Sequence, residues 1–341
     1  MTGSAGFIGF HICKLLLEQG HEVNGIDSFT NYYDSSLKEK RNELLETYKK
    51  FRLGRIDIED KPAFLEAWQA FMPEVVIHLA AQAGVRYSIE QPDTYVATNI
   101  VGTYNILEIA RHNPIQHLLI ASTSSVYGAN ERMPFIETER TAHPMSLYAA
   151  TKGATELIGH SYSHLYNIPL TFFRFFTVYG PWGRPDMALF KFVKATLADE
   201  QIDVYNEGKM IRDFTYVGDL VESVYALCGK VPGKEPICVE DSLSPVAPFR
   251  VVNIGGGNPT SLMTYIECMA AALGKKAKLN MLPMQSGDVA ATNASVDLLK
   301  SLIGFVPTTP VAVGVPLFVK WYREYFQVDV DPAPENPAIS L

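Results

Sequence analysis

The stretch Thr2-Gly3-Ser4-Ala5-Gly6-Phe7-Ile8-Gly9 opens the chain and leads into an apolar segment, 11–17, that ends at Gly20. Glycines at the amino terminus of a helix allow a tight turn and a close approach of the backbone to a pyrophosphate, which the free N–H groups and the helix dipole stabilise. The spacing is GxxGxxG, so a tight turn that binds nothing is the alternative interpretation. We expect a dinucleotide site with contacts at Gly3, Gly6, Phe7, Ile8 and Gly9.

An aspartate strengthens the dinucleotide interpretation. Asp27 ends the next apolar run, about twenty residues after the loop, where a carboxylate accepts both hydroxyls of an adenosine ribose. An acid at this position also repels a 2′-phosphate, so the sequence predicts NAD rather than NADP. Asp57, after a further short run, either faces the adenine amino group or is simply a turn aspartate.

Short apolar runs alternate with longer amphipathic segments from residue 1 to about 180, which is typical of βαβ units. The runs 22–27, 75–80, 117–121 and 170–175 predict buried parallel strands, and the stripe on segment 95–111 is either buried or shared with a partner. After about residue 181 the pattern breaks, and 230–248 is expected to be a surface loop. We therefore expect an α/β fold with a doubly wound, mostly parallel Rossmann-type sheet and a smaller α/β lobe.

The first strand of this sheet is expected to be missing or truncated. A phosphate-binding loop normally follows a strand of about five apolar residues, whereas only two residues precede Gly3. The strands that end at Asp27 and His78 would then lack a shared neighbour.

Composition excludes several classes of protein. The chain has 341 residues, of which 47% are apolar and 19% charged, and a formal net charge of −8 argues against a nucleic-acid partner. No run approaches the roughly 18 apolar residues of a membrane span, and no basic region precedes an apolar core, so we expect a cytoplasmic protein with no membrane partner. Four cysteines without CxxC spacing predict reduced thiols and no metal site.

A hydroxyl cluster and a Tyr-x-x-x-Lys pair carry the predicted chemistry. Tyr148 and Lys152 are four residues apart and share a helix face, where the lysine cation would favour the phenolate and bring the tyrosine pKa toward neutrality. The cluster Ser122-Thr123-Ser124-Ser125-Val126-Tyr127-Gly128 follows a predicted strand, at the edge where open α/β sheets bind ligands. A surface helix and a capped turn are the alternatives.

These segments, in this order, resemble the extended short-chain dehydrogenase/reductase superfamily, which acts on nucleotide-linked sugars. The resemblance rests on the glycine loop, His78-Leu79-Ala80-Ala81, the hydroxyl cluster, Tyr148-x-x-x-Lys152 and Arg212-Asp213-Phe214-Thr215-Tyr216-Val217-x-Asp219. It implies a catalytic triad of Thr123, Tyr148 and Lys152, with Ser125 near the same substrate hydroxyl and Arg212 on the substrate diphosphate. It also implies cofactor-binding residues at Asp57, Ile58, Leu79, Ala80, Ala81, Asn99, Tyr148 and Lys152.

The resemblance narrows the reaction. Related dehydratases carry Asp-Glu and uronate decarboxylases carry Ser-Glu before Val-Tyr-Gly, whereas this chain has Ser124 and Ser125. Without a second proton-transfer group, the implied outcome is oxidation at sugar C4, rotation of the keto intermediate and return of the hydride, which is 4-epimerisation.

Two segments, 80–88 and 174–188, resemble UDP-glucuronate 4-epimerases. A uronate adds a carboxylate, which Arg184 would hold by a bidentate contact, with Thr177, Ser124 and Arg86 as further candidates. Surface salt bridges are the alternative for both arginines. The resemblance also places Asp288 on the uridine ribose and Tyr205 beside the uracil, with a strand position in a small sheet as the alternative for Tyr205. Gln285 stands where glucose/galactose epimerases have an arginine.

Alternative functions remain open at this point. A UDP-glucose/galactose-type 4-epimerase or a UDP-uronate decarboxylase uses the same scaffold, and a non-catalytic sugar-nucleotide sensor would be indicated by loss of the triad, which is intact. The expected domains are 1–180 with a return segment at about 213–255 for NAD, and 181–212 with 256–341 for the UDP-sugar. The resemblance also implies a homodimer through paired helices.

Overall fold

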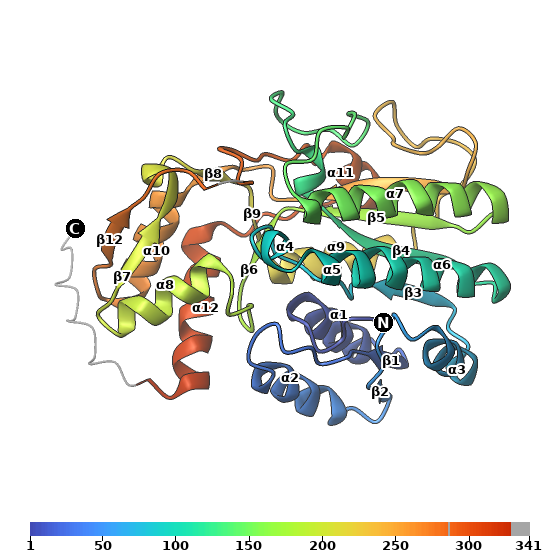
Figure 1. Cartoon of the computed structure of the whole chain (residues 1–341), viewed down its shortest axis with the longest axis horizontal. Helices are drawn as coiled ribbons and strands as arrows, with labels where there is room; N and C mark the ends of the chain where they lie inside the picture. Colours follow the sequence, from blue (N-terminus) through green and yellow to red (C-terminus); the bar gives the residue numbers. More distant parts are fainter. Residues whose placement is uncertain (286, 329–341) are drawn as a thin grey trace.

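The centre of the fold is a parallel sheet in the order β10-β5-β4-β3, seen in a computed structural model that describes residues 1–285 and 287–328 (Figure 1). Its strands are β3 (Val75–His78), β4 (His117–Thr123), β5 (Leu170–Phe175) and β10 (Phe249–Ile254), all paired in parallel register. A second parallel pair, β1 (Val23–Ile26) with β2 (Phe51–Gly54), continues the sheet beyond β3. The predicted α/β class is confirmed.

Residues 1–3 stand between β1 and β3, where a central strand would run. Thr2 bridges both strands: its N–H donates to the Ile77 carbonyl at 3.0 Å, and its neighbour Met1 accepts from the Ile26 N–H at 2.8 Å. Among the described residues no ladder joins β1 directly to β3. In the described part of the chain, residues 1–3 join β1 and β3 by isolated bridges and hydrogen bonds rather than by a full strand.

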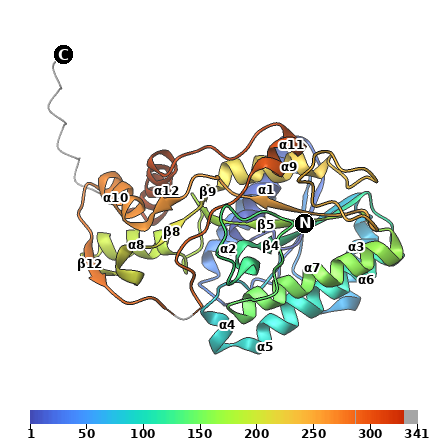
Figure 2. The ribbon, with the colours of Figure 1, turned by 90° about the horizontal axis from the view of Figure 1, so that it is seen from above.

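Helices cover both faces of the sheet, as the doubly wound prediction requires (Figure 2). On one face α1 (Phe7–Glu18) packs on α9 (Val217–Cys228), and Leu119 and Ala121 of β4 point into their cluster. On the other face lie α3 (Lys61–Phe71), α6 (Thr103–His112) and α7 (Leu147–Tyr166), whose cluster includes Leu118 and Ile120. Successive side chains of a strand alternate between faces, which explains this division.

The helix expected over 95–111 is broken into three pieces. α5 (Pro92–Tyr95) runs into a π-helical segment, η1 (Val96–Gly102), and then into α6. Thr103, Ile106, Leu107 and Ala110 are buried as the stripe predicted, whereas Val96 is 44% exposed. The π-helical turn has more residues per turn than an α-helix, so the residues before it no longer lie on the buried face of α6.

A smaller lobe follows β5, on the left of Figure 1. It consists of α8 (Ala188–Leu197), β7 (Gln201–Val204), α10 (Leu262–Leu273), β12 (Lys278–Met281) and α12 (Val311–Phe326), with β7 and β12 in parallel. Its core is rich in aromatic side chains, including Phe214 and Tyr265, whose rings stack 4.0 Å apart. Burial of such large rings is the main stabilising contribution to this lobe.

One helix of the region assigned by sequence to the substrate lobe packs on the sheet. The short helix α11 (Asp297–Ile303) was placed by sequence in the substrate lobe, but its Leu298, Leu299 and Leu302 are buried in the cluster with Val252 and Ile254 of β10. The chain thus returns to the sheet once more before forming α12. Residues 329–341 of the expected lobe lie outside the described residues.

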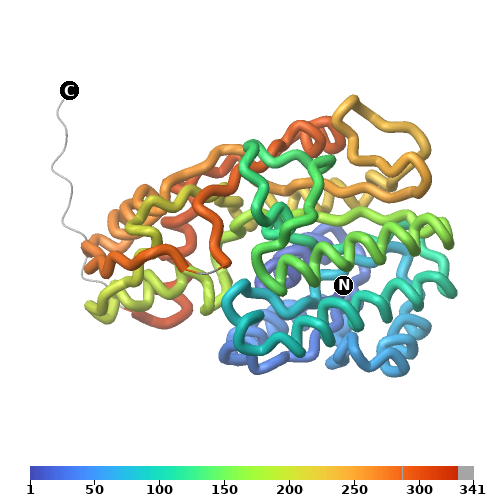
Figure 3. Tube along the Cα trace, turned by 45° about the horizontal axis from the view of Figure 1, so that its top comes forward, coloured from blue at the N-terminus to red at the C-terminus, as the bar shows by residue number. Residues whose placement is uncertain are grey.

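The remaining elements are the helix α2, which follows β1, and several short helical turns and strands. They are α2 (Ser36–Glu46), α4 (Tyr87–Glu90), η2 (Ser124–Tyr127), β6 (Thr177–Tyr179), η3 (Tyr205–Gly208), β8 (Ile211–Arg212), β9 (Phe214–Tyr216) and β11 (Thr260–Ser261). The segment 230–248 contains neither helix nor strand, in agreement with the surface loop expected there. It arches away from α10 and α12 (Figure 3). Its base is fixed by Asp241, which accepts from Arg250 at 2.8 and 2.9 Å. None of the described helices has the length and apolar character needed to cross a bilayer.

Candidate active site

A cavity of about 1320 Å³ opens along the carboxyl ends of β1, β3, β4 and β5 and extends to the smaller lobe. This is where open α/β sheets bind ligands. The cavity brings together nearly all of the residues predicted from the sequence: Gly3, Gly6, Phe7, Ile8, Gly9, Asp27, Asp57, Ile58, Leu79, Ala80, Ala81, Arg86, Thr123, Ser124, Ser125, Tyr148, Lys152, Thr177, Arg184, Tyr205, Arg212 and Asp288.

The glycine loop forms a cradle at the start of α1. Gly3 has a φ of +70°, and a Cβ added to it would lie 2.8 Å from the Ala80 nitrogen, while a Cβ on Gly9 would overlap the Gly3 carbonyl. α1 begins at Phe7 without a side-chain cap, so its first N–H groups remain available to an anion. The cradle therefore fits the pyrophosphate of NAD.

Asp27 is fixed at the end of β1 and is 6% exposed. Its Oδ1 accepts from the Phe29 N–H at 2.8 Å and its Oδ2 accepts from the Ala5 N–H at 3.1 Å, with the Lys38 ammonium 3.5 Å away. Asp57 also lines the cavity, but it is exposed and its Oδ1 accepts from the Glu59 N–H, which is the turn geometry left open by the sequence.

The first turn of α7 carries the predicted proton acceptor. Ser146 caps this helix by accepting from the Ala149 N–H at 3.1 Å, which places Tyr148 at its amino end. Thr123 similarly caps η2, and its hydroxyl lies within 3.2 Å of Ser125 Oγ. Helix α7 and the end of β4 thus hold the predicted catalytic groups in one corner of the cavity.

The electrostatics of this corner differ from the sequence-based expectation. Burial raises the pKa of Tyr148, while a hydrogen bond from Thr123 and the charge of Arg184 act in the opposite direction. Burial lowers the pKa of Lys152 to about 8, although the charge of Glu156 opposes this. The pKa of Tyr148 is therefore raised in this geometry rather than brought toward neutrality, because both the phenol and the lysine beside it are desolvated.

Asn99 does not line the cavity but lies behind it, where it supports the site through its helix. Its Oδ1 accepts from the Gln82 N–H at 2.8 Å, and its Nδ2 donates to the Gln82 carbonyl and the Thr151 hydroxyl at 3.0 and 3.1 Å. It therefore ties the loop after β3 to α7 from behind. The π-helical segment that presents Asn99 is a feature that periodicity does not reveal.

Both candidate carboxylate-binding arginines already have acidic partners. Arg184 Nε donates to Asp186 Oδ1 at 2.9 Å and its Nη2 donates to Oδ2, while Arg86 lies 3.5 Å from Asp288 and over the Tyr205 ring. The salt-bridge alternative is thus present at both sites, within the cavity rather than on a distant surface. Asp288, expected to face a ribose, lies on the cavity wall beside Arg86.

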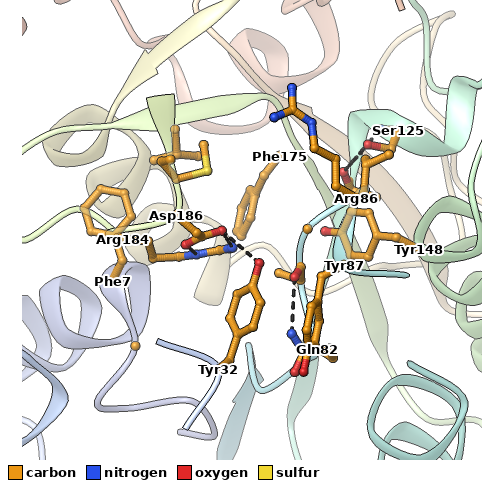
Figure 4. Close-up of a pocket in the computed structure, with 18 of the residues that line it drawn as sticks. Phe7, Tyr32, Gln82, Arg86, Tyr87, Ser125, Tyr148, Phe175, Arg184 and Asp186 are labelled. Carbon is orange, nitrogen blue, oxygen red and sulfur yellow. Dashed lines mark hydrogen bonds and ion pairs between the residues drawn. The ribbon is translucent and has the colours of Figure 1, made fainter. Parts of the chain in front are cut away.

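Sequence reasoning missed several lining residues. Tyr32 and Asp186 lie beside Arg184 in the pocket (Figure 4), and Lys191 lines the cavity from α8. Arg212 was predicted, and its Nη1 donates to the Ile211 and Ala290 carbonyls without a carboxylate partner in the described part of the chain. The only sequence feature that could have indicated Lys191 as a lining residue is its position in the first turn of α8, directly after the segment that carries Arg184.

A buried ion pair supports the catalytic corner from below. Arg174 Nε and Nη2 donate to the two oxygens of Glu156 at 3.0 and 2.7 Å, and Ser122 donates to Oε1 of the same carboxylate. Glu156 lies on α7 one turn after Lys152, while Ser122 precedes Thr123 on β4. The pair thus connects β5, β4 and α7 beneath the reacting groups.

Comparison with known proteins agrees with this geometry. Residues 1–239 match the family model described as the NAD dependent epimerase/dehydratase family. A probable UDP-glucuronate 4-epimerase of Rhizobium meliloti (strain 1021) is 54% identical over 331 residues, covering 96% of this chain and 97% of that protein. The crystal structure of the UDP-glucuronic acid 4-epimerase from Bacillus cereus, in complex with UDP-glucuronic acid and NAD, superposes with a TM-score of 0.85 at 32% identity, covering 95% and 98% of the two chains. The UDP-glucose 4-epimerase of Thermotoga maritima gives a TM-score of 0.82 at 26% identity, covering 95% and 98%. The chain belongs to the NAD-dependent epimerase/dehydratase family.

Proposed function

We infer that this protein catalyses the NAD-dependent 4-epimerisation of UDP-glucuronate to UDP-galacturonate. The observation that carries the proposal is the corner at the end of β4. Tyr148 lines the cavity there together with the hydroxyls of Thr123, Ser124 and Ser125, and serines stand at both positions where related dehydratases carry Asp-Glu. With a nicotinamide as hydride acceptor, one proton acceptor suffices for oxidation of the C4 hydroxyl to a ketone and for its reduction back to the alcohol. The 54% identity to a probable UDP-glucuronate 4-epimerase supports the choice of sugar.

The residues of the cavity divide the chemical work. When bound, NAD supplies a reversible acceptor for the hydride of sugar C4. Tyr148 accepts the proton of the C4 hydroxyl and later returns it, and Thr123 orients both groups by hydrogen bonding. Lys152, buried in the same wall, stabilises the phenolate when charged. Gly3 and Gly9 would hold the pyrophosphate of the dinucleotide, and Asp27 its adenosine ribose.

We assign the UDP-sugar to the part of the cavity that faces the smaller lobe. Arg212 and Lys191 line it without carboxylate partners among the described residues, so they are suited to the diphosphate. Lys191 would then supply to the diphosphate the positive charge that an arginine supplies in glucose/galactose epimerases at the position of Gln285. Thr177, Ser124 and the unshared edge of Arg184 surround the expected position of the uronate carboxylate. The uridine would contact Tyr205 and Asp288, which lie on the same wall.

The decisive experiment incubates the purified protein with UDP-glucuronate and no added NAD, followed by chromatographic separation of the uronates. Formation of UDP-galacturonate supports the proposal. Products that form only from UDP-glucose would favour the hexose epimerase, and conversion of all substrate to a pentose would favour the decarboxylase.

A homodimer is part of the proposal. The outer faces of the neighbouring helices α6 and α7 expose apolar side chains: Tyr104 is 42%, Leu157 76% and Leu165 63% exposed. Exposed apolar surface of this kind is typical of contacts between subunits. Sedimentation analysis of the full chain measures the oligomeric state directly.

Two further expectations are retained as proposals. Residues 1–180 with 213–255 bind NAD, and 181–212 with the remaining described residues of the smaller lobe bind the UDP-sugar, with α11 reassigned to the sheet. A cytoplasmic location agrees with the four free cysteines, which form no disulfides.

A further inference from the structure

Arg184 is held by only one edge of its guanidinium. Its Nε and Nη2 donate to Asp186, two residues further along the same turn, and the Met187 N–H closes that turn on the Arg184 carbonyl at 3.1 Å. In the described part of the chain Nη1 has no partner. A guanidinium held at one edge presents its other edge in a fixed plane to a second planar acceptor.

Tyr32 fixes Asp186 from the other lobe. Its hydroxyl donates to Asp186 Oδ2 at 3.1 Å, and burial raises the pKa of Tyr32 to about 12, so the phenol keeps its proton at neutral pH. Its ring lies 4.7 Å from that of Tyr87, and a Cβ on Gly84 would come within 2.8 Å of the Tyr32 hydroxyl. Tyr32 is therefore wedged between the loop 83–87 and the turn that carries Arg184 (Figure 4).

This cluster lies close to the reacting groups. The charge of Arg184 acts on the Tyr148 phenol, and both line the same cavity. Because Asp186 is ionised, with its pKa lowered by Arg184, the cluster has little net charge to attract an anion. Its contribution to a bound carboxylate is direction rather than attraction.

We propose that Tyr32 and Asp186 are positioning residues that hold the Arg184 guanidinium against the uronate carboxylate and thereby suppress decarboxylation of the keto intermediate. The inference rests on the proposed function. Neither residue touches the reacting atoms, and each acts through Arg184.

The chemistry explains why direction matters. Removal of the C4 hydride to NAD and of the C4 hydroxyl proton to Tyr148 leaves a 4-keto uronate, which is a β-keto acid. If the carboxylate rotates perpendicular to the carbonyl plane, the C5–C6 bond breaks, CO₂ leaves and the electron pair forms an enolate between C4 and C5. The enolate takes a proton from water at C5 and becomes UDP-4-keto-pentose, while the hydride stays on the nicotinamide. A carboxylate held near the carbonyl plane cannot follow this course.

The test compares the parent protein with the variants Tyr32→Phe and Asp186→Asn. Each receives UDP-glucuronate labelled with ¹⁴C in the carboxylate, and released ¹⁴CO₂ is measured against UDP-galacturonate. We expect both variants to raise the ratio of CO₂ to epimer at least tenfold. Tyr48→Phe is the matched control, because its hydroxyl donates to Glu18 at 3.2 Å outside the cavity, and it should keep the parent ratio.

Binding provides a second measurement that a merely structural role would not produce. Asp186→Asn removes a like charge beside the substrate carboxylate, so calorimetry should show UDP-glucuronate bound at least as tightly as by the parent, with UDP-glucose unchanged. Parent ratios in both variants, or an equal loss of binding and of all products, would overturn the positioning proposal alone. A parent protein that forms no UDP-galacturonate would overturn the proposed function and this inference together.

Discussion

The buried pair between Glu156 and Arg174 is expected to stabilise the sheet lobe far more than a surface pair of the same chemistry. The side chains of Glu156 and Arg174 are 8% and 4% exposed, and their two hydrogen bonds are 3.0 and 2.7 Å long. Glu156→Gln leaves a charged guanidinium in the core with no carboxylate, which costs about 3–5 kcal/mol. At roughly 2–4 °C per kcal/mol for a domain of this size, the melting temperature should fall by at least about 6 °C.

Glu39→Gln provides the matched control. Glu39 also accepts two N–H groups of one arginine, Arg55, but the two side chains are 42% and 53% exposed. Its loss should cost no more than about 1 kcal/mol. Scanning calorimetry measures the melting temperatures of both variants and of the parent protein. Equal decreases in the two variants would refute the conclusion that burial makes the Glu156–Arg174 pair more stabilising. Because Ser122 donates to Glu156, the Glu156 variant should also lose turnover while the control keeps it.

Four further outcomes are expected. Tyr148→Phe should reduce turnover at least about a hundredfold while UDP-sugar binding, measured by calorimetry, remains, because only the proton acceptor is removed; higher activity would place the base elsewhere. Lys191→Ala should weaken UDP binding by about tenfold, whereas Lys194→Ala, one turn further along α8 and outside the cavity, should not. Burial raises the pKa of Glu137 from 4.5 to about 7, so the folded state binds the extra proton and the free energy of unfolding falls as the pH rises from 4.5 to 7; Glu137→Gln should show a smaller fall in urea titrations. Leu157→Asp should shift the sedimentation of a dimer toward monomer without loss of fold, since this side chain is 76% exposed.

The sequence predicted the parts of the site that depend on local chemistry. The glycine loop, Asp27 and the hydroxyls after β4 occupy positions where the backbone itself creates the binding surface, so residue type and spacing were sufficient. The strands could be predicted as well, because a short, continuous apolar run is typical of a parallel strand that is covered by helices on both faces of the sheet.

The parts that failed depend on contacts across the chain. Arg86 and Asp288 are 202 residues apart, and no spacing rule connects them. The π-helical turn rotated Asn99 away from the cavity, because one extra residue per turn changes which side chains share a face. The sequence could not place α11 either, because three leucines in a short helix do not indicate which of two apolar cores they join.

Several charged residues that were considered one by one in the sequence form ion pairs in the structure, and this changes how they can interact with a substrate. Asp27 with Lys38, Asp288 with Arg86 and Asp186 with Arg184 each bring a cation and a carboxylate to the cavity wall. Such pairs attract an anion weakly, but each fixes the orientation of donors that point into the cavity. Attraction is left to Lys152, Lys191 and Arg212, which line the cavity without a carboxylate in ion-pair distance among the described residues. Because the keto intermediate of a uronate must rotate without losing CO₂, a wall of oriented and nearly neutral donors suits this reaction better than a strongly positive one, which would hold the sugar on a single face.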